Sequence, residues 1–260
     1  MNLAARFRKI ISQRQIISSM VTKNLKEKYI GSSLGIFWAL INPVLIMLAI
    51  AFVFTQIMKT DSRHFPLLVL SALMPWFFFV NSVTEATASM DKNADLLRQF
   101  IMTREIIPIS VVLANFLNFL FGFLILIPVF IVFNAETTKY LFLLPLVMFL
   151  HFVFTLGISF AFSIGNVYFK DLSQLLNVGM MFLFWLTPVF YTLEMIPNNF
   201  QRLIIANPGT CYAVIYRDLL YSGAGGPAYL WLLATLFSFL SIIGGYWLFI
   251  KNEREILKLI

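Results

Sequence analysis

The sequence predicts an all-α, polytopic membrane protein with a single transmembrane domain over residues 1–260. Apolar residues make up 60% of the chain and charged residues only 12%, whereas roughly a quarter of the residues in a soluble domain are charged. Several apolar runs reach the length of about 20 residues that a helix needs to cross a bilayer. Because these runs do not alternate polar and apolar side chains with a period of two, a transmembrane β-barrel is disfavoured.

Residues 1–35 are predicted to form an amphipathic segment at the membrane interface. On a helix, its apolar side chains fall on one stripe with basic side chains opposite, and a basic helix of this kind lies in the plane of the lipid headgroups. Arg14 and Lys28 fall on the apolar stripe and would have to snorkel. A disordered basic arm is the alternative interpretation. The stripe comprises Leu3, Phe7, Ile10, Ile17, Val21 and Leu25.

Six membrane-spanning helices are predicted in residues 36–250, followed by a cytoplasmic tail, 251–260. The first apolar run begins near Ile36, after a long basic segment, which is not the pattern of a cleavable signal peptide. The second span contains Pro75, and the third is long enough to tilt. The predicted spans are 36–58, 65–83, 106–133, 140–165, 175–191 and 229–250.

The distribution of Lys and Arg predicts that both termini are cytoplasmic. With that orientation, most of the 19 Lys and Arg residues fall in cytoplasmic segments, as the positive-inside rule requires. In so apolar a chain, the net charge of +7 favours anionic lipid over nucleic acid as a partner. The outside segments hold Lys59, Arg63, Lys139, Arg202 and Arg217.

A short amphipathic segment, residues 90–104, lies between the second and third spans; we call it the coupling segment. Its apolar side chains share one helical face, and its charged side chains lie at its start and on the opposite side. Asp91 is suited to cap the first turn. The residues alone leave two interpretations open, a docking helix for a soluble partner or an ordinary interfacial helix. The apolar set is Leu96, Leu97, Phe100 and Ile101, and the charged set is Asp91, Lys92, Asp95 and Arg98.

Residues 192–228, which we call the outer segment, are too long for an ordinary connection between the fifth and sixth spans. The segment contains apolar stretches that are too short to cross a membrane, and a turn at 222–227. We expect short helices that dip into the outer leaflet, which is possible only where protein or water satisfies their backbone.

Small and polar residues within the spans predict contacts between helices. Gly157 and Gly165 fall on one face of the fourth span, where small residues allow a close approach, either within the chain or between subunits. Asn115, Asn118 and His151 are expected to form hydrogen bonds between helices, with a role in a transport path as the alternative.

The sequence contains no catalytic or metal-binding motif. It has no phosphate-binding loop of the G-x-x-x-x-G-K-[ST] type, no H-E-x-x-H and no cluster of carboxylates. The single cysteine, Cys211, excludes a disulfide within the chain and a Cys-rich metal site. We therefore expect no enzyme activity, metal or cofactor in this chain.

Aromatic residues make up 17% of the sequence, and some are candidates for a surface on which sugar rings slide. Aromatic faces stack on sugars without demanding one hydrogen-bond geometry. Packing against lipid is the alternative interpretation. The candidates are Phe37, Trp38, Phe184, Trp185 and Tyr191.

Four stretches with this joint spacing resemble the ABC-2 type permeases that export polysaccharides. Two positions depart from the family pattern. Met102-Thr103 stands where Phe-Pro is frequent, and Lys170-Asp171 replaces Arg-Asp. The four stretches are residues 25–43 (LKEKYIGSSLGIFWALINP), 93–108, 166–172 (NVYFKDL) and 187–208.

The resemblance implies a half-transporter of the cytoplasmic (inner) membrane. Two copies would form a channel, and each would dock on a separate cytoplasmic ATPase, which binds ATP and Mg. The resemblance places Asp91, Lys92, Asp95, Leu96, Leu97, Arg98 and Phe100 at the ATPase, and Phe37, Trp38, Phe184, Trp185 and Tyr191 beside the glycan. It places Lys23, Lys26, Lys28 and Tyr29 where the lipid headgroup enters, and Pro188, Pro197, Asn207 and Pro208 at an outer gate.

The expected substrate is an O-antigen polysaccharide linked to undecaprenyl diphosphate. Export of teichoic acid or capsular polysaccharide is the alternative within the family, because no residue pattern identifies the sugar. A membrane-embedded glycosyl- or acyltransferase would need a carboxylate or His pair at one membrane face. A secondary transporter should show internal repeats and buried ionisable groups, which the sequence does not suggest.

Overall fold

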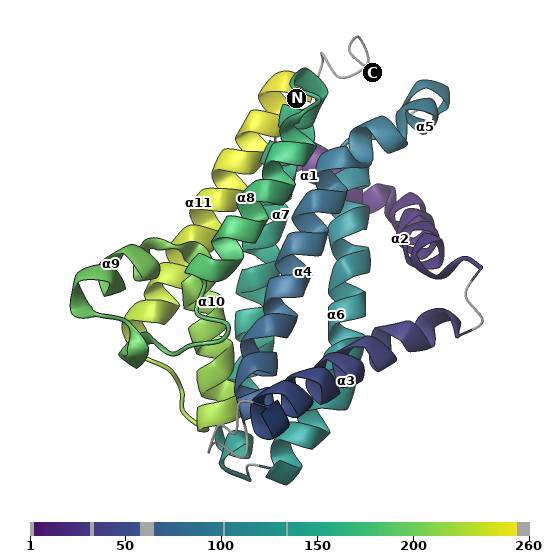
Figure 1. The fold of residues 1–260 in the computed structure, drawn as a ribbon. Helices are drawn as coiled ribbons and strands as arrows, with labels where there is room; N and C mark the ends of the chain where they lie inside the picture. The colour runs from purple at the N-terminus through teal and green to yellow at the C-terminus, as the bar shows by residue number, and fades with distance from the viewer. Residues whose placement is uncertain (1–2, 32–33, 58–64, 101, 134, 254–260) are drawn as a thin grey trace.

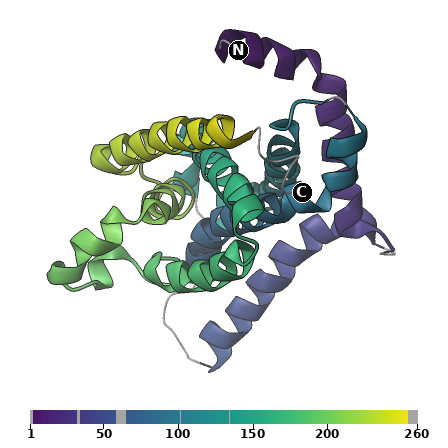
Figure 2. The same cartoon turned by 90° about the horizontal axis from the view of Figure 1, so that it is seen from above.

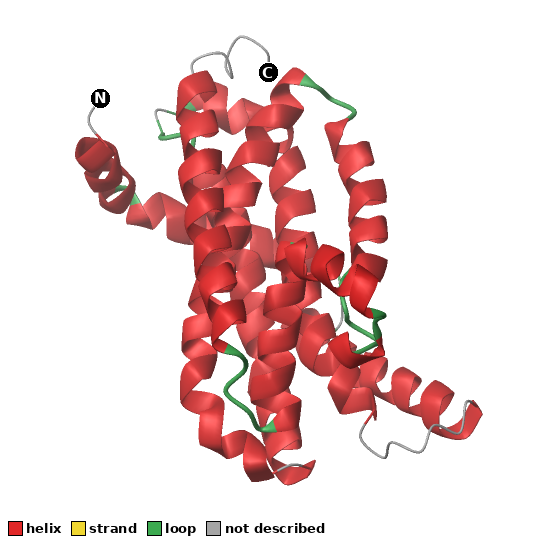
Figure 3. Cartoon of the chain, turned by 90° about the vertical axis from the view of Figure 1, so that its left-hand side faces the viewer, coloured by secondary structure: helices red, strands yellow, loops and turns green. Residues whose placement is uncertain are grey.

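The computed structural model describes residues 3–31, 34–57, 65–100, 102–133 and 135–253, and it shows helices joined by short loops (Figure 1). No strand occurs in these ranges (Figure 3), which confirms the predicted all-α class. The α-helices are α1 (Leu3–Ser12), α2 (Arg14–Tyr29), α3 (Trp38–Ala51), α4 (Phe65–Lys92), α5 (Ala94–Gln99), α6 (Ile106–Phe133), α7 (Leu144–Tyr168), α8 (Leu172–Leu186), α9 (Asn198–Ala206), α10 (Pro208–Arg217) and α11 (Ala228–Asn252). Short 3-10 or π turns cover Gly35–Phe37, Phe52–Ile57, Ala135–Leu143, Leu193–Met195 and Asp218–Ser222.

Four long apolar helices form the bundle that supports the other elements. α4, α6, α7 and α11 have the length and composition to cross a bilayer. α7 packs against both α4 and α11, and α6 packs against α4 (Figure 1). α6 has the predicted bounds of the third span, and α11 differs from the sixth by one or two residues at each end. The chain is therefore a membrane protein with several spans.

The predicted first and fifth spans correspond to shorter helices. α3 has 14 residues and α8 has 15, so each is roughly 21–23 Å long, less than the ~30 Å hydrocarbon core. α3 continues into the π turn Phe52–Ile57, and residue 58, the predicted end of the first span, lies outside the described residues. α3 crosses the bundle obliquely, whereas α8 lies along α4 and α7 (Figures 1 and 2).

α4 is longer than the second span predicted from the sequence. It continues from the predicted end at Val83 to Lys92. Polar residues lower the hydropathy of this last part without ending the helix. Their hydroxyls donate to backbone carbonyls three or four residues back, as Thr84, Thr87 and Ser89 do. The fall in hydropathy after Val83 therefore indicates where the apolar stretch ends, whereas the helix continues to Lys92.

α7 and α11 cross at a point where glycine is required on both helices. A Cβ on Gly157 would overlap the backbone of Ser241, and a Cβ on Gly245 would overlap the Gly157 carbonyl. The predicted close approach of small residues is therefore confirmed for Gly157, and it occurs within the chain. Gly165 faces the Leu172 side chain instead.

The amphipathic N-terminal segment consists of two helices with different surroundings. α1 exposes apolar side chains such as Phe7, which is 66% exposed. α2 packs against α6, and Met20 and Val21 are buried there. The apolar stripe predicted for α2 therefore faces the protein and not lipid, since Val21 is buried and Ile17 packs on the apolar cluster around Met20. The stripe faces outward only in α1, and the chain changes direction at Gln13, between the two helices (Figure 2).

We predict that Gly245→Ala destabilises the protein, because the added methyl group overlaps a backbone carbonyl that cannot move aside. Forcing atoms into a packed site costs about 1–3 kcal/mol or more. Thermal unfolding of the purified chain in detergent measures the change. Gly244→Ala is the matched control, since nothing lies within 4 Å of a Cβ there. Equal melting temperatures of the two variants would contradict the packing argument.

Candidate functional site

The coupling segment forms an exposed corner at the end of the bundle where α1 and the C-terminal end of α11 also lie (Figure 1). Its helix, α5, covers only Ala94–Gln99, so the predicted helix over 90–104 is too long. Leu97 is buried at 6% exposure and Leu96 packs on the same apolar cluster, whereas Phe100 is 60% exposed. Asp95 and Arg98 are exposed. Ile101 lies outside the described residues.

Asp91 and Lys92 belong to the end of α4 and not to the coupling helix. The predicted cap by Asp91 is wrong, because Asn93 occupies the N-cap position and its side chain forms no capping bond. Asp91 accepts a hydrogen bond from Asn166 Nδ2 (2.9 Å) and pairs with the Lys170 ammonium. Asp91 therefore ties the end of α4 to the turn between α7 and α8, and only Lys92 of the pair is exposed.

The stretch 166–172 builds that turn through one asparagine. Asn166 Oδ1 accepts from the backbone N–H of Ser173 (3.2 Å) while its Nδ2 donates to Asp91. The side chain thus satisfies a donor in the first turn of α8, where helix N–H groups lack partners. Lys170 supplies the positive charge that faces Asp91.

The coupling segment ends at a hydrogen bond to the junction of α1 and α2. Gln13 Oε1 accepts from both the backbone N–H (3.1 Å) and the Oγ1 (2.6 Å) of Thr103. A proline at position 103 would have no N–H to donate. Thr103, in place of the proline frequent in related permeases, therefore lets the N-terminal helices hold the exit of the coupling segment.

Ionic contacts join the same exit to both ends of the described chain. The Arg6 guanidinium donates to Glu105 (3.1 Å) and to the Glu253 carboxylate, and Arg104 donates to the Glu253 backbone carbonyl. The hydrogen bond to Glu253 raises the pKa of Arg6 above its ordinary value, against the effect of burial. α1, the start of α6 and the end of α11 therefore meet behind the coupling segment.

The residues predicted for the lipid headgroup mostly contact the protein itself. Lys28 Nζ lies 2.9 Å from Glu85 and donates to Asn115 Oδ1 (2.6 Å), and the Tyr29 hydroxyl donates to Asn118 Oδ1 (2.5 Å). These contacts confirm the predicted hydrogen bonding between helices for both asparagines.

Nearer the α5 end, Lys23 donates to Asn93 Oδ1 at 2.9 Å, whereas Lys26 is exposed. α2 is therefore attached to α4 and α6 through polar contacts.

The aromatic residues proposed for the glycan path fall into two groups. Phe184 and Trp185 meet edge to face with centroids 5.4 Å apart, and the Tyr191 hydroxyl donates to the Trp185 carbonyl (2.9 Å). Trp185 is 65% exposed. Phe37 and Trp38 lie at the start of α3, away from α8 (Figure 1). Within one copy, the predicted set is not brought together.

The outer segment folds into α9, α10 and short turns, as the sequence predicted. Asn207 Oδ1 caps α10 through the Gly209 N–H (3.0 Å), and its Nδ2 donates to Thr187 Oγ1 (2.9 Å). Pro208 occupies the first turn of α10, a preferred position for proline. Pro188 is buried, whereas Pro197 is exposed at the start of α9. The four predicted gate residues are therefore spread over the segment.

One buried arginine holds the loop after α8 in place. Arg217 is only 4% exposed. Its Nη1 donates to the Tyr191 carbonyl (2.9 Å), and its Nη2 donates to the carbonyls of Val189 (3.0 Å) and Pro188. The fixed fork of a guanidinium suits several acceptors at once. We call this set of contacts the Arg217 clamp.

His151 is buried in an aromatic cluster. Its ring stacks on Tyr212 with centroids 4.4 Å apart and meets Phe78 edge to face. No described residue forms a hydrogen bond with its Nδ1. The sequence predicts a hydrogen bond between helices for His151, and its Nδ1 does not form one with the described residues. Aromatic packing holds the ring instead.

Comparison with known proteins identifies the family. The family model of the ABC-2 type transporter matches residues 15–221. The chain belongs to the ABC-2 type transporter family. It is 30% identical over 230 residues to the O-antigen export system permease protein RfbA of Klebsiella pneumoniae, covering 86% of this chain and 87% of that protein.

Two further relatives span a similar part of the chain. The RfbA protein of Myxococcus xanthus, also named an O-antigen export system permease, is 29% identical and covers 82% of this chain and 83% of its own length. The polysialic acid transport protein KpsM of Escherichia coli is 21% identical over 81% of this chain and 83% of its own length. The ABC-2 match includes the coupling segment and the Arg217 clamp, whereas α1 and α11 lie outside it.

Two contacts of this ABC-2 family member lie beyond what its sequence predicts. The Arg217 clamp has one signal in the sequence, because Arg217 and Asp218 interrupt the apolar run AVIYRDLLY and charged groups in such a run need partners. The pair of Glu85 with Lys28 has no such signal, since Glu85 lies beyond Val83, the predicted end of the second span.

We predict that Arg217→Gln destabilises the outer segment, because buried carbonyls of the loop after α8 lose their donor. An unsatisfied buried polar group costs about 1–3 kcal/mol. Denaturant unfolding in detergent and protease cleavage within 187–192 measure the effect. Arg202→Gln on the exposed surface of α9 is the matched control and should change stability by at most about 0.5 kcal/mol. Indistinguishable variants would show that the clamp does not hold the loop.

Proposed function

We propose that this chain is the transmembrane permease of an ATP-driven exporter that moves lipid-linked O-antigen polysaccharide across the cytoplasmic membrane. The observation that carries the proposal is the 30% identity, over 86% of the chain, to a protein named as an O-antigen export permease. Export of a capsular polysaccharide is the second candidate. The 21% identity to a polysialic acid transport protein supports it more weakly.

The permease takes its energy from a separate ATPase. The sequence has no phosphate-binding loop, so ATP and Mg bind to the partner and not to this chain. The exposed corner of α5, with Asp95, Arg98 and Phe100, offers the ATPase a surface of mixed charge and one aromatic anchor. ATP can shift the permease only through contacts that differ between its open and closed states. The coupling segment is where such contacts form.

In the membrane, the permease has six spans with both termini in the cytoplasm. The four long helices are joined by α3 and α8, which cross as shorter or tilted elements. This arrangement places α5 on the cytoplasmic side and the outer segment on the opposite side, in agreement with the distribution of Lys and Arg. α1 lies on the inner face with Phe7 in the lipid.

The glycan path forms between two copies of the chain. Within one copy, α3 and α8 carry the proposed path residues on separate surfaces. α8 exposes a row of large apolar side chains, among them Val178, Phe182 and Trp185. A second copy facing this surface would bring Trp38 of one copy near Trp185 of the other. The Arg217 clamp and the α10 start then border the outer opening.

Deletion of the gene tests the function directly. We expect the host to lose O-antigen at its surface while the undecaprenyl-linked glycan accumulates inside the cell. Immunoblots of surface polysaccharide and lipid extraction measure both. Complementation with the wild-type gene should restore the surface glycan. Unchanged surface O-antigen in the deletion strain would overturn the proposal, and selective loss of a capsule would favour the second candidate.

For coupling, we predict that the double substitution Asp95→Lys and Arg98→Glu abolishes co-purification with the ATPase. The double substitution inverts the charge pattern that α5 presents, and like charges set against each other cost several kcal/mol at an interface. Export should fall in parallel while the permease still inserts in the membrane. Arg202→Glu, on α9, is the control and should retain the ATPase. Normal co-purification and export by the double variant would exclude α5 as the coupling element.

A further inference from the structure

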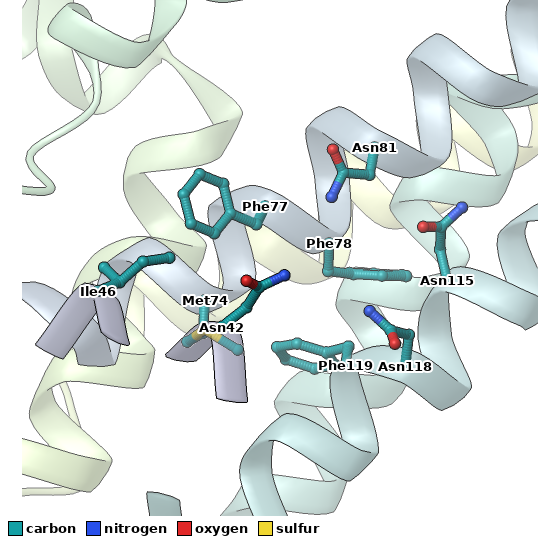
Figure 4. Close-up of a pocket in the computed structure, with 9 residues that line it drawn as sticks. All are labelled: Asn42, Ile46, Met74, Phe77, Phe78, Asn81, Asn115, Asn118 and Phe119. Carbon is teal, nitrogen blue, oxygen red and sulfur yellow. The ribbon is translucent and has the colours of Figure 1, made fainter. Parts of the chain in front are cut away.

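A cavity of about 370 Å³ opens between α3, α4 and α6, and the proposed glycan path does not include it. Its volume is in the range of small-molecule sites, roughly 300–1,000 Å³. Figure 4 shows four carboxamides arranged around one space, with phenylalanine rings beside them. We call it the amide cavity. Its lining residues are Asn42, Ile46, Met74, Phe77, Phe78, Asn81, Asn115, Asn118 and Phe119.

The amide cavity lies far from the α5 end of the bundle, several helical turns along α4 and α6. Asn81 precedes the end of α4 at Lys92 by about three helical turns, or roughly 16 Å, and Asn118 follows the start of α6 at Ile106 by roughly 18 Å. Carboxamides at such a depth in a bilayer cost free energy unless they form hydrogen bonds. Their presence on three different helices therefore calls for polar partners.

Two of the four asparagines have such partners, and two do not. Asn115 accepts from Lys28 and donates to Glu85 (2.8 Å), and Asn118 accepts from Tyr29. The carboxamides of Asn42 and Asn81 form no hydrogen bond with any described residue, and both side chains are exposed to the cavity. An occupant with both donors and acceptors would satisfy them.

The balance of charge beside the amide cavity indicates which class of molecule fits it. The charged pair beside the amide cavity, Lys28 and Glu85, is mutually compensated at 2.9 Å. No net charge is left to attract a phosphate or to bind a cation. Carboxamides pair with hydroxyl groups, and the partly exposed Phe77 ring offers an apolar face to the C–H surface of a ring. Phe78 and Phe119, each 3% exposed, stack on one another with centroids 5.1 Å apart and form an apolar wall. A neutral, hydroxyl-rich ring therefore fits better than a diphosphate or an acyl chain.

A polar route connects the amide cavity with the α5 end of the bundle. Asn81, Glu85 and Ser89 recur every fourth residue and so share one face of α4, and Asn93 follows at the N-cap of α5. Along that face lies a second cavity of about 400 Å³ between α2, α4 and α6. Lys28 and Glu85 line the second cavity and Asn115 lines the amide cavity, so their bridge stands between the two.

We propose that the amide cavity is a binding site for neutral sugar residues, with Asn42 and Asn81 as hydrogen-bonding groups and the Phe77 ring as a stacking surface. The assignment of these sugars to the exported glycan rests on the proposed function. The site itself follows from the unsatisfied carboxamides, the aromatic lining and the compensated charge.

Protection of a cysteine at position 46 tests the site. Ile46 lines the cavity and is not one of its proposed hydrogen-bonding groups. The native Cys211 is fully buried, so Ile46→Cys in the full-length chain, in a lipid nanodisc, provides a reactive thiol at the cavity. A polar methanethiosulfonate reagent labels it. The probes are glucose, galactose, mannose, rhamnose and N-acetylglucosamine, at about 50 mM each. Labelling should slow by the factor 1 + [L]/Kd, about sixfold for a Kd of about 10 mM.

Controls separate a sugar site from other occupants. Asn199→Cys on exposed α9 should label at the same rate with and without sugar, and inorganic pyrophosphate should protect neither cysteine. No slowing by any of the five sugars would overturn the proposal and indicate a cavity that holds water alone. Equal protection by pyrophosphate would overturn it in favour of an anion site.

An export assay distinguishes failure of the site from failure of the proposed function. Asn81→Leu should lower the rate of O-antigen appearance about fivefold at normal protein levels. Asn81→Gln should keep most of the rate, and Asn199→Leu all of it. If deletion of the gene abolishes export but Asn81→Leu exports normally, the role of the cavity is overturned and the permease function stands. If sugars protect position 46 but the deletion strain still exports, the function fails and the binding site stands.

Discussion

Polar groups that lie away from water must be satisfied inside the protein, and this requirement shapes the helical bundle. The Lys28 ammonium, Glu85 and Asn115 join three helices through mutual contacts. Between α10 and α11, the Tyr212 hydroxyl lies 2.8 Å from Ser238 Oγ, which donates to the Leu150 carbonyl on α7. In a bilayer no solvent can replace these partners. These contacts therefore fix which helices lie side by side at the positions where the polar groups occur.

The long helices could be predicted from the sequence because one property, sustained hydropathy, decides whether a segment enters a membrane. α6 and α11 follow it almost to the residue. Hydropathy alone does not predict where a helix ends or which face is buried when hydrogen bonds or protein packing also contribute. α4 continues through Thr84 and Ser89, whose hydroxyls bond to the helix backbone, and the apolar side of α2 at Val21 is buried by protein and not by lipid.

The types of residue in the candidate site could be predicted from the sequence, but the residues that they contact could not. The exposed corner at Asp95 and Arg98 follows from helical spacing in a short connection. Asp91 has the same chemistry, yet it faces Asn166 and Lys170, which lie 75 and 79 residues away in the chain. Nothing local in the sequence encodes such a pairing. The same holds for Gln13 with Thr103, since their meeting depends on how α1 and α2 turn.

The network of Arg6, Glu105 and Glu253 joins residues that are synthesised at very different times. Arg6 is made near the start of translation, whereas Glu253 directly follows α11. Chains fold progressively from the N-terminus during synthesis, so the region behind α5 stays unfinished until α11 has been inserted. A chain that stops before Glu253 would leave the Arg6 guanidinium without that carboxylate behind α5.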